Sequence, residues 1–278
     1  MATKKCIFTW VFFTILIITT VTLAVAADTV TFQGTTKTNA GDFVILKGKL
    51  TKPQGDGPFP AVVLVHGCTG IVKYNDDWAD RLASWGYVAF QVDSFGPRGE
   101  SEICRRANVI PFHVRTQDAY DARAYLAGLP FIDRNRIAIM GWSQGGITTL
   151  SAISNANYAY WATVLAGASR SRKQEIPFRA AIAFYPFCQG ELEDSNAPLL
   201  ILVGELDNWT PAISCQMRMP SGKAAHEIIL KIYPGAYHGF DMEGTDKVML
   251  ERYRVLYNPE ALADSIVQVK GFLGKHLK

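Results

Sequence analysis

The residues best suited to chemistry in this sequence centre on a serine between two glycines. Ser143 stands in the stretch GWSQGG, two residues after Gly141 and two residues before Gly145. An apolar run over residues 136–142 precedes it, and a stretch typical of a helix, residues 145–154, follows it. The chain must therefore turn sharply from a strand into a helix at Ser143, and such a turn lifts a serine hydroxyl clear of the sheet edge. This context favours a nucleophilic serine over an ordinary glycine-rich turn.

A serine hydroxyl is a poor nucleophile until a base takes its proton, and that base must be oriented by a carboxylate. Two residues later in the chain fit these roles. Asp207 ends the apolar run 198–207, and His238 follows the run 226–235. Both stand just beyond predicted strands, and the carboxyl ends of such strands meet at one edge of a parallel sheet. The sequence therefore predicts acyl transfer to Ser143, with His238 as general base and Asp207 as its orienting acid.

The same regions contain rival acids and donors for an oxyanion. Glu205 is the main alternative to Asp207, and Asp241 is a weaker one because it follows the histidine by only three residues. Acyl transfer also needs N–H donors for the negative oxygen of the tetrahedral intermediate. The stretch LVHGCTG ends another apolar run, so the backbone N–H groups of Cys68 and Gln144 are the predicted donors.

These residues must be positioned by elements that alternate along the chain. Continuous apolar runs, typical of strands covered on both faces, are separated by stretches of helical period. Such alternation predicts an α/β fold with a mostly parallel central sheet and helices on both faces. The predicted strands are residues 29–33, 42–50, 59–67, 87–96, 136–142, 179–186, 198–207 and 226–235, and the predicted helices are residues 75–86, 114–130, 145–154 and 258–277.

The first 27 residues are predicted to be a signal peptide, and residues 28–278 a single domain. Two lysines precede an almost wholly apolar run over residues 7–26, and Ala24 and Ala26 form an A-x-A cleavage pattern. The apolar run is long enough to span a bilayer, so an uncleaved membrane anchor is the alternative. Both interpretations place the remaining chain outside the cytoplasm, secreted or periplasmic in the first and membrane-anchored in the second.

Charge and cysteine usage limit the partners. The net charge of +3 comes without a long basic patch, which argues against nucleic acid and favours a small-molecule substrate. No C-x-x-C pair exists and the five histidines are scattered, so neither a metal nor another cofactor is predicted.

Loss of Cys6 with the signal peptide would leave four cysteines in the mature chain. An even number favours pairing in an oxidising compartment, and three connectivities are possible. The sequence makes no prediction of the oligomeric state.

Five motifs in this order, VHGCTG, DSFGPRG, GWSQGG, GELDNWTP and YHGF, resemble the dienelactone hydrolase family of α/β-hydrolases. The likeness covers most of residues 40–276 and implies the α/β-hydrolase fold and hydrolysis of esters or lactones. The family characteristically has cysteine where this chain has Ser143, which shifts the expectation toward ordinary ester hydrolysis. The family's substrate arginine maps onto Arg98, and Trp142 beside the nucleophile is also expected to contact substrate.

In the fold that the resemblance implies, the strands before Cys68 and Cys104 are neighbours in the sheet. The strands before Cys188 and Cys215 are neighbours as well. That order predicts disulfides Cys68–Cys104 and Cys188–Cys215, which would clamp loops around the catalytic mouth, with four free thiols as the alternative. The sequon that begins at Asn208 lies beside the predicted acid, so a bacterial periplasm or exterior is favoured over a eukaryotic secretory route.

Two other functions remain open at this point. A serine peptidase of the prolyl-oligopeptidase type shares the catalytic residues, but the sequence before the first predicted strands leaves little room for its large additional domain. A noncatalytic binding member of the fold is the alternative from another class. Residues 156–178, with Tyr158, Tyr160 and Trp161, are expected to form either a small lid or simple aromatic packing.

Overall fold

The computed structural model describes residues 27–38, 41–156 and 177–277. The predicted signal peptide, except for Ala27, and the aromatic residues Tyr158, Tyr160 and Trp161 lie outside this part of the chain. The strands are β1 (Ala27–Lys37), β2 (Phe43–Thr51), β3 (Phe59–Val65), β4 (Val88–Asp93), β5 (Ile132–Trp142), β6 (Ala181–Phe184), β7 (Leu199–Gly204), β8 (Ile228–Tyr233), β9 (Asp246–Met249) and β10 (Tyr253–Leu256). The helices are α1 (Lys73–Ser84), α2 (Phe112–Ala127), α3 (Gln144–Ala152), α5 (Ile213–Gln216) and α6 (Pro259–His276), with short 3-10 turns at Gly96–Arg98 and Leu192–Asp194.

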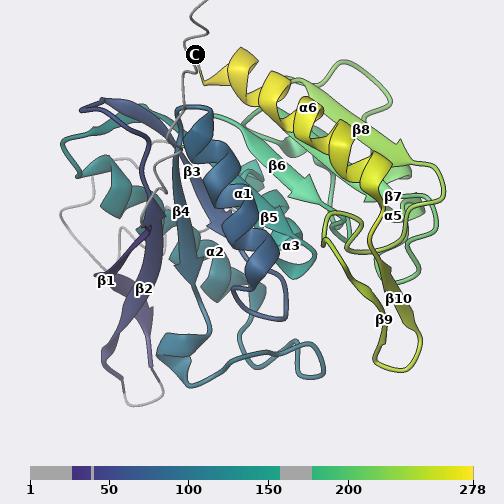
Figure 1. Cartoon of the computed structure of the whole chain (residues 1–278), viewed down its shortest axis with the longest axis horizontal. Coiled ribbons are helices and arrows are strands. Elements are labelled where there is room, and N and C mark those ends of the chain that lie inside the picture. Colours follow the sequence, from purple (N-terminus) through teal and green to yellow (C-terminus); the bar gives the residue numbers. More distant parts are fainter. Residues whose placement is uncertain (1–26, 39–40, 157–176, 278) are drawn as a thin grey trace, which may run out of the picture.

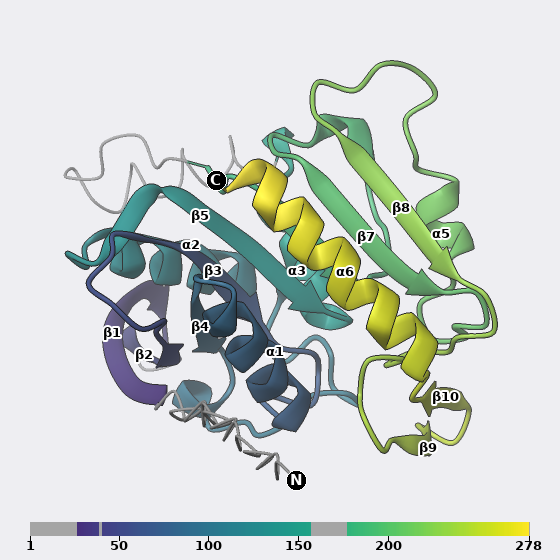
Figure 2. The same ribbon diagram turned by 45° about the horizontal axis from the view of Figure 1, so that its top comes forward.

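Eight strands form one sheet in the order β1-β2-β4-β3-β5-β6-β7-β8. Strands β3 to β8 pair in parallel, whereas β2 runs antiparallel to both β1 and β4. Helices α1 and α6 cover one face of the sheet, and α2 and α3 cover the other (Figure 1). Figure 2 shows α6 lying across the face of the sheet near β5 and β7. The predicted mostly parallel sheet with helices on both faces is confirmed.

Side-chain alternation along β5 divides the interior into two cores. Ile137 and Ile139 belong to the core under α2 and α3, whereas Ala138, Met140 and Trp142 belong to the core under α1 and α6. Because both faces are covered, the strand is apolar without interruption over this stretch, as are the neighbouring central strands. The two cores fix the carboxyl end of β5, from which Ser143 follows.

A two-stranded hairpin, β9–β10, was not predicted from the sequence. It lies beyond the carboxyl ends of the parallel strands, apart from the main sheet (Figure 1). Its turn residues Leu250 and Glu251 both have positive φ, 51° and 63°. Such a turn is normally built from Asn-Gly or Asp-Gly, so the sequence carried no hairpin signal here. The hairpin is attached to the predicted base, because the Leu256 N–H donates to the His238 carbonyl oxygen at 3.1 Å.

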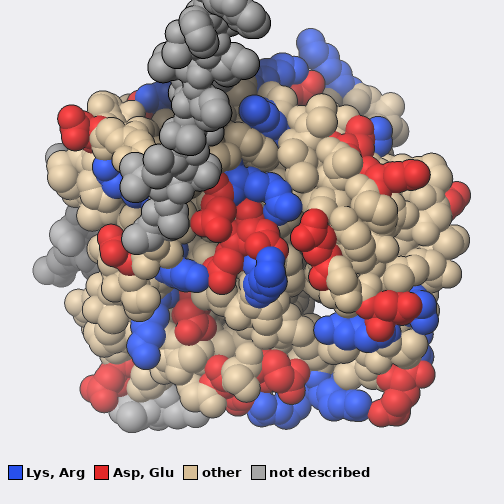
Figure 3. All heavy atoms as spheres, in the orientation of Figure 1, with Lys and Arg blue, Asp and Glu red and all other residues tan. Residues whose placement is uncertain are grey.

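Charges on the face that carries α1 and α6 are mixed. Lysine and arginine side chains are interspersed with aspartate and glutamate over this face (Figure 3). A face of mixed sign is typical of a solvated surface. Within the described chain, no helix has both the length and the apolar character needed to cross a membrane.

Two disulfides connect the loops around the carboxyl edge of the sheet. Cys68 is bonded to Cys104, and Cys188 is bonded to Cys215, the pairing predicted from the family resemblance. The first joins the loop after β3 to the loop after β4, and the second joins the segment after β6 to α5. Disulfides of this kind persist in oxidising compartments, so they fit an extracellular protein.

Removing the second disulfide should cost stability. The Cys188→Ala/Cys215→Ala variant is expected to lose about 2–4 kcal/mol of unfolding free energy, because its unfolded chain keeps only one of the two cross-links. Urea unfolding of the variant and of the oxidised parent protein measures this difference, and non-reducing peptide mapping identifies the pairs. Four alkylatable thiols in protein made in an oxidising compartment, or a Cys68–Cys188 peptide, would contradict the pairing.

Candidate active site

The three residues predicted to act together lie in one hydrogen-bonded series at the carboxyl edge of the sheet. Ser143 follows β5, Asp207 follows β7, and His238 follows β8. The His238 Nε2 atom lies 3.0 Å from Ser143 Oγ, and its Nδ1 atom lies 2.7 Å from Asp207 Oδ2. Asp207 and His238 are almost fully buried. With a neutral imidazole protonated on Nδ1, the other ring nitrogen can accept a proton from the serine.

Ser143 occupies a strained turn that the neighbouring glycines permit. Its φ is 52° and its ψ is −115°, a conformation that residues with a β-carbon rarely adopt. A β-carbon at Gly141 would stand 2.2 Å from the Gly145 carbonyl oxygen, and one at Gly145 would stand 1.9 Å from the Val65 carbonyl oxygen. Both positions therefore exclude any side chain. The strand-to-helix turn inferred from the sequence thus depends on direct backbone contact with the end of β3.

Asp207 is fixed by the residues that follow it. Its Oδ1 atom accepts the backbone N–H groups of Trp209 and Thr210, each at 2.8 Å. The Thr210 hydroxyl lies 3.0 Å from Asp207 Oδ2, 3.1 Å from His238 Nδ1 and 2.9 Å from the carbonyl oxygen of Tyr185. The carboxylate is therefore held with one oxygen toward the imidazole. Thr210 was not singled out from the sequence, where it stood only as the last residue of a sequon.

Neither rival acid contacts the histidine ring. Glu205 is exposed and its carboxylate accepts the Gly235 N–H at 2.9 Å. Asp241 is buried on the α1 side, where its carboxylate accepts Trp78 Nε1–H and Trp142 Nε1–H at 2.9 Å and the Tyr185 hydroxyl at 2.6 Å. Burial raises the pKa of Asp241. The geometry favours Asp207 as the acid.

Aromatic rings enclose the imidazole. The Tyr185 ring lies 4.5 Å from the His238 ring between centroids, and the Trp209 ring lies 4.9 Å from it. Tyr253 of the hairpin stacks on Trp209 at 4.9 Å with an interplanar angle of 3°. Tyr185 directly follows β6 and has a φ of 36°, so the backbone is strained at the residue whose ring packs on the imidazole. Sequence reasoning missed Tyr185, and its pattern FYP gives no sign of a positive φ.

The two predicted oxyanion donors are free to bind. Among the described residues, neither the Cys68 N–H nor the Gln144 N–H donates to another group. Gln144 begins α3, whose amino end favours developing negative charge. Cys68 lies two residues beyond His66 in the loop after β3. A substrate oxygen bound between these N–H groups would be stabilised as it becomes negative.

His66 is buried and neutral rather than catalytic. Its Nδ1 lies 2.8 Å from the Gly67 carbonyl oxygen, and its Nε2 accepts the Ser94 N–H at 3.3 Å. Burial, with a further contribution from the nearby Arg115 charge, lowers the pKa of His66 to about 3. The folded protein therefore keeps this imidazole uncharged. The ring connects the loop after β3, which carries Cys68, to the segment after β4.

Buried His66 should make the free energy of unfolding depend on pH. Because its folded pKa is below the ordinary value of about 6.5, the unfolded chain binds the extra proton between these two pH values, and stability falls as the pH drops through that window. The free energy of unfolding is expected to fall by about 2 kcal/mol between pH 7 and pH 5 from this residue. Urea unfolding of the His66→Gln variant, whose amide cannot take up the proton, should give a shallower pH dependence, and parallel curves would contradict this assignment.

The predictions that Arg98 and Trp142 contact substrate are not supported. The Arg98 guanidinium bonds both carboxylate oxygens of buried Asp118 at 2.8 Å, the Ser94 carbonyl oxygen at 2.7 Å and the Thr36 hydroxyl at 2.7 Å. Both Nη atoms are therefore bonded within the protein, and Arg98 does not line the cavity at Ser143. Trp142 is fully buried and its indole N–H bonds Asp241. Both residues support the structure around the site.

A small cavity of about 30 Å³ lies beside Ser143 and His238. The hairpin contributes Lys247, Met249 and Val255 to it. The remaining lining residues are Gly67, Cys68, Thr69, Tyr74, Ser143, Trp209, His238 and Met242. The Tyr74 hydroxyl is buried, and burial raises its pKa, so it stays a neutral donor. It was also missed from the sequence.

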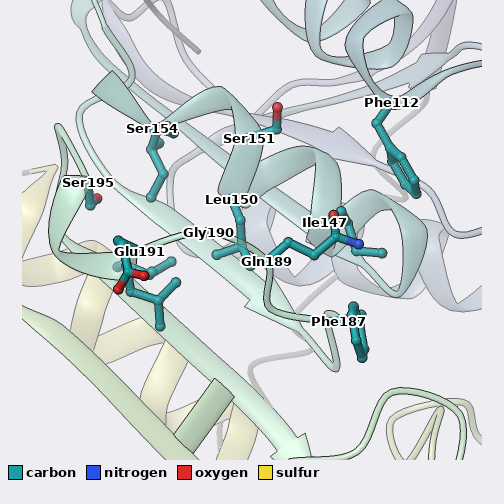
Figure 4. A pocket seen from close by; sticks show the side chains of 13 residues that line it. Phe112, Ile147, Leu150, Ser151, Ser154, Phe187, Gln189, Gly190, Glu191 and Ser195 are labelled. Carbon is teal, nitrogen blue, oxygen red and sulfur yellow. The ribbon is translucent and has the colours of Figure 1, made fainter. Parts of the chain in front are cut away.

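A larger cavity of about 220 Å³ opens along α3 and the segment after β6 (Figure 4). Phe112, Ile147, Leu150 and Phe187 form part of its apolar wall. None of the three residues of the hydrogen-bonded series lines it. It lies along α3, the helix that follows Ser143, and no residue of the β9–β10 hairpin lines it.

Comparisons with known proteins agree with this architecture. The model of the dienelactone hydrolase family matches residues 46–277. A protein of Bradyrhizobium sp named "Probable 2-oxo-3-(5-oxofuran-2-ylidene)propanoate lactonase" is 26% identical over 251 residues, which cover 82% of this chain and 88% of that protein. A solved dienelactone hydrolase-like promiscuous phosphotriesterase from metagenomic libraries superposes with a TM-score of 0.67 at 17% identity, covering 91% of this chain and 100% of that one.

A shorter match points to a different group of proteins. A protein of Grosmannia clavigera named "Probable dipeptidyl-aminopeptidase B" is 41% identical over 75 residues, which are 26% of this chain but only 7% of that protein. The family match, by contrast, extends over nearly all of the described fold. The chain therefore belongs to the dienelactone hydrolase family of α/β-hydrolases and is a hydrolase of the type that acts on ester or lactone bonds.

Proposed function

We propose that this protein is an exported serine hydrolase that cleaves carboxylic esters through an acyl-enzyme on Ser143. The observation that carries the proposal is the hydrogen-bonded series in which His238 Nε2 lies 3.0 Å from the Ser143 hydroxyl and Nδ1 lies 2.7 Å from Asp207. Nucleophile, base and orienting acid are the parts that acyl transfer requires.

The reaction proceeds in two halves. Ser143 Oγ attacks the ester carbonyl carbon while its proton moves to His238 Nε2, and the negative oxygen accepts the N–H groups of Cys68 and Gln144. The imidazolium, oriented by Asp207, then protonates the leaving alcohol. In the second half, His238 takes a proton from water as the water attacks the acyl-enzyme, and it returns this proton to Ser143 Oγ as the acyl–oxygen bond breaks and the acid leaves.

The space at the serine favours esters of short acids. The cavity beside Ser143 has a volume of only about 30 Å³, which favours a short acyl group next to the serine. The Tyr74 hydroxyl offers a further donor to an ester or lactone oxygen in this space. We therefore expect acetyl esters to react faster than octanoyl esters.

Export is supported by the disulfides. Two bonded cysteine pairs near the site fit an oxidising compartment, and we propose that residues 1–27 form the signal peptide that directs the chain there. Amino-terminal sequencing of the mature protein from an expressing bacterium tests this part, since an intact amino terminus would instead indicate a membrane anchor.

A panel of substrates tests the reaction. The purified protein is assayed with p-nitrophenyl esters of increasing acyl length, a lactone and a peptide p-nitroanilide, and a fluorophosphonate probe is used to label the nucleophile. Ester turnover with the probe on Ser143 supports the proposal. Absence of both turnover and labelling would instead favour a noncatalytic binding protein.

A peptidase is the second candidate, and the 75-residue match to the dipeptidyl-aminopeptidase relative favours it. Such an enzyme uses the same nucleophile and base, so Ser143 labelling does not distinguish the two. Turnover of the peptide p-nitroanilide above that of the acetyl ester would favour the peptidase.

A further inference from the structure

Arg115 of α2 is a buried cation beneath the two loops that carry the candidate oxyanion donors. Its side chain is inaccessible to solvent. One guanidinium nitrogen, Nη1, donates to the Gln144 side-chain oxygen at 2.9 Å, and the other, Nη2, donates to the His66 carbonyl oxygen at 2.5 Å. The guanidinium also lies over the Phe95 ring, 4.9 Å from its centroid. The arginine therefore bonds the loop after β3 and the serine turn at the same time.

These two loops already touch at one point. A β-carbon at Gly145 would stand 1.9 Å from the Val65 carbonyl oxygen and 2.6 Å from that of His66, so the backbones are in direct contact. Arg115 adds a second connection, because it bonds the carbonyl of His66, two residues before Cys68, and the side chain of Gln144. The distance between the Cys68 N–H and the Gln144 N–H depends on both connections.

The charge of Arg115 has no carboxylate bonded to it among the described residues. Asp118 is near enough to favour the charged form, but both of its oxygens are bonded by Arg98. Burial lowers the pKa of Arg115 to about 10, so the guanidinium remains charged at neutral pH. His66, the other ionisable group in contact with it, is neutral. The Arg115 Nε–H has no partner in the described chain.

We propose that Arg115 is a positioning residue for acyl transfer, which sets the spacing of the Cys68 and Gln144 N–H donors and places a buried positive charge behind them. This inference rests on the function proposed above. A buried charge without a bonded counter-charge is costly. The tetrahedral intermediate supplies negative charge on the oxygen that these donors bind, so the cation interacts more favourably with the transition state than with the neutral ester.

The role predicts an effect on kcat rather than on KM. The Arg115→Met variant, which removes the charge and both hydrogen bonds, is expected to lower kcat for p-nitrophenyl acetate by about 10- to 100-fold with KM changed less than about threefold. The affinity for a trifluoromethyl ketone, which forms a tetrahedral adduct with the serine, should fall by the same factor as kcat. Arg115→Lys keeps the charge and should recover part of the loss.

A matched control separates positioning from stability. Arg123 lies two turns further along α2, is also buried, and bonds the Arg134 carbonyl oxygen away from the serine. Arg123→Met should lower the melting temperature but leave kcat and the ketone affinity within about twofold of the parent values. Gln144→Ala keeps the backbone N–H and removes the acceptor for Arg115, together with a long 3.5 Å bond from Gln144 Nε2 to the Ala107 carbonyl oxygen. It should lower kcat by about 10-fold and provides the test if Arg115→Met does not fold.

The outcomes distinguish this inference from the proposed function. Failure of the parent protein to turn over ester or bind the ketone contradicts the proposed function itself. An active parent protein, with folded Arg115→Met or Gln144→Ala variants that retain its kcat and ketone affinity, contradicts the positioning role alone. Equal losses in Arg115→Met and Arg123→Met would assign the effect to stability and overturn the inference.

Discussion

Replacing Ser143 by alanine is expected to lower kcat for p-nitrophenyl acetate by roughly 10⁶-fold and to leave the fold intact. The hydroxyl is the atom group that would form the acyl-enzyme, and His238 Nε2 lies 3.0 Å from it. Alanine is smaller, and it removes the bond to His238 without leaving a buried charge. Steady-state kinetics for kcat, and circular dichroism for the fold, measure the two parts of this expectation.

The His238→Ala variant is expected to lose about as much, because removal of either member disables the same proton-transfer unit. The Ser143→Ala/His238→Ala double variant should therefore be hardly less active than either single variant. Ser265→Ala serves as a control, since this serine is fully buried and its hydroxyl bonds the Leu262 carbonyl oxygen within α6. Near-parental turnover by Ser143→Ala would reject the assignment of the nucleophile and with it the mechanism.

The positions of these three residues could be predicted because each one follows a strand of a parallel sheet. Ser143, Asp207 and His238 are separated by more than thirty residues at each step, yet the carboxyl ends of their strands lie at one edge. Apolar runs identify the strands, and the fold then brings their ends together. Local pattern and topology were sufficient for this part of the site.

The structure places Arg98 and Trp142 in contacts within the protein, and the two residues differ in how far the sequence could show those contacts. Arg98 stands on the expected rim, but its partner Asp118 lies on α2, and nothing in either local sequence shows that they pair. Trp142 could have been placed correctly from strand alternation. It shares a strand face with Ala138 and Met140, which pack under α1 and α6, so its side chain points into a core rather than toward the substrate.

The hairpin and the rings around His238 could not be predicted because their causes are not local. Leu250 and Glu251 adopt positive φ without a glycine or asparagine, and contacts between the hairpin and Trp209 hold this turn in place. Tyr185 takes a positive φ while its hydroxyl bonds Asp241 and its ring faces the imidazole. Tertiary contacts therefore override the backbone preferences of these residues.

The second large effect is expected from replacing the orienting acid, and it is tested by comparing Asp207 with Glu205 and Asp241. Asp207→Asn is expected to lower kcat by about 10⁴-fold, less than the loss in Ser143→Ala. The asparagine oxygen can still accept the N–H groups of Trp209 and Thr210, so its amide would face His238 Nδ1 and favour the imidazole tautomer with its proton on Nε2. That tautomer cannot accept the serine proton.

Substitutions of the two rival acids supply the comparison for Asp207→Asn. Glu205→Gln should keep its kcat within about twofold, because the exposed side chain only accepts the Gly235 N–H, which an amide oxygen also accepts. Asp241→Asn should mainly lower the melting temperature, because its carboxylate bonds Trp78, Trp142 and Tyr185 but not the imidazole. A fully active Asp207→Asn together with an inactive Glu205→Gln or a folded but inactive Asp241→Asn would reassign the acid while leaving Ser143 and His238 in their roles. Kinetics of the three variants at one pH, each with its melting temperature, therefore test the acid separately from the nucleophile.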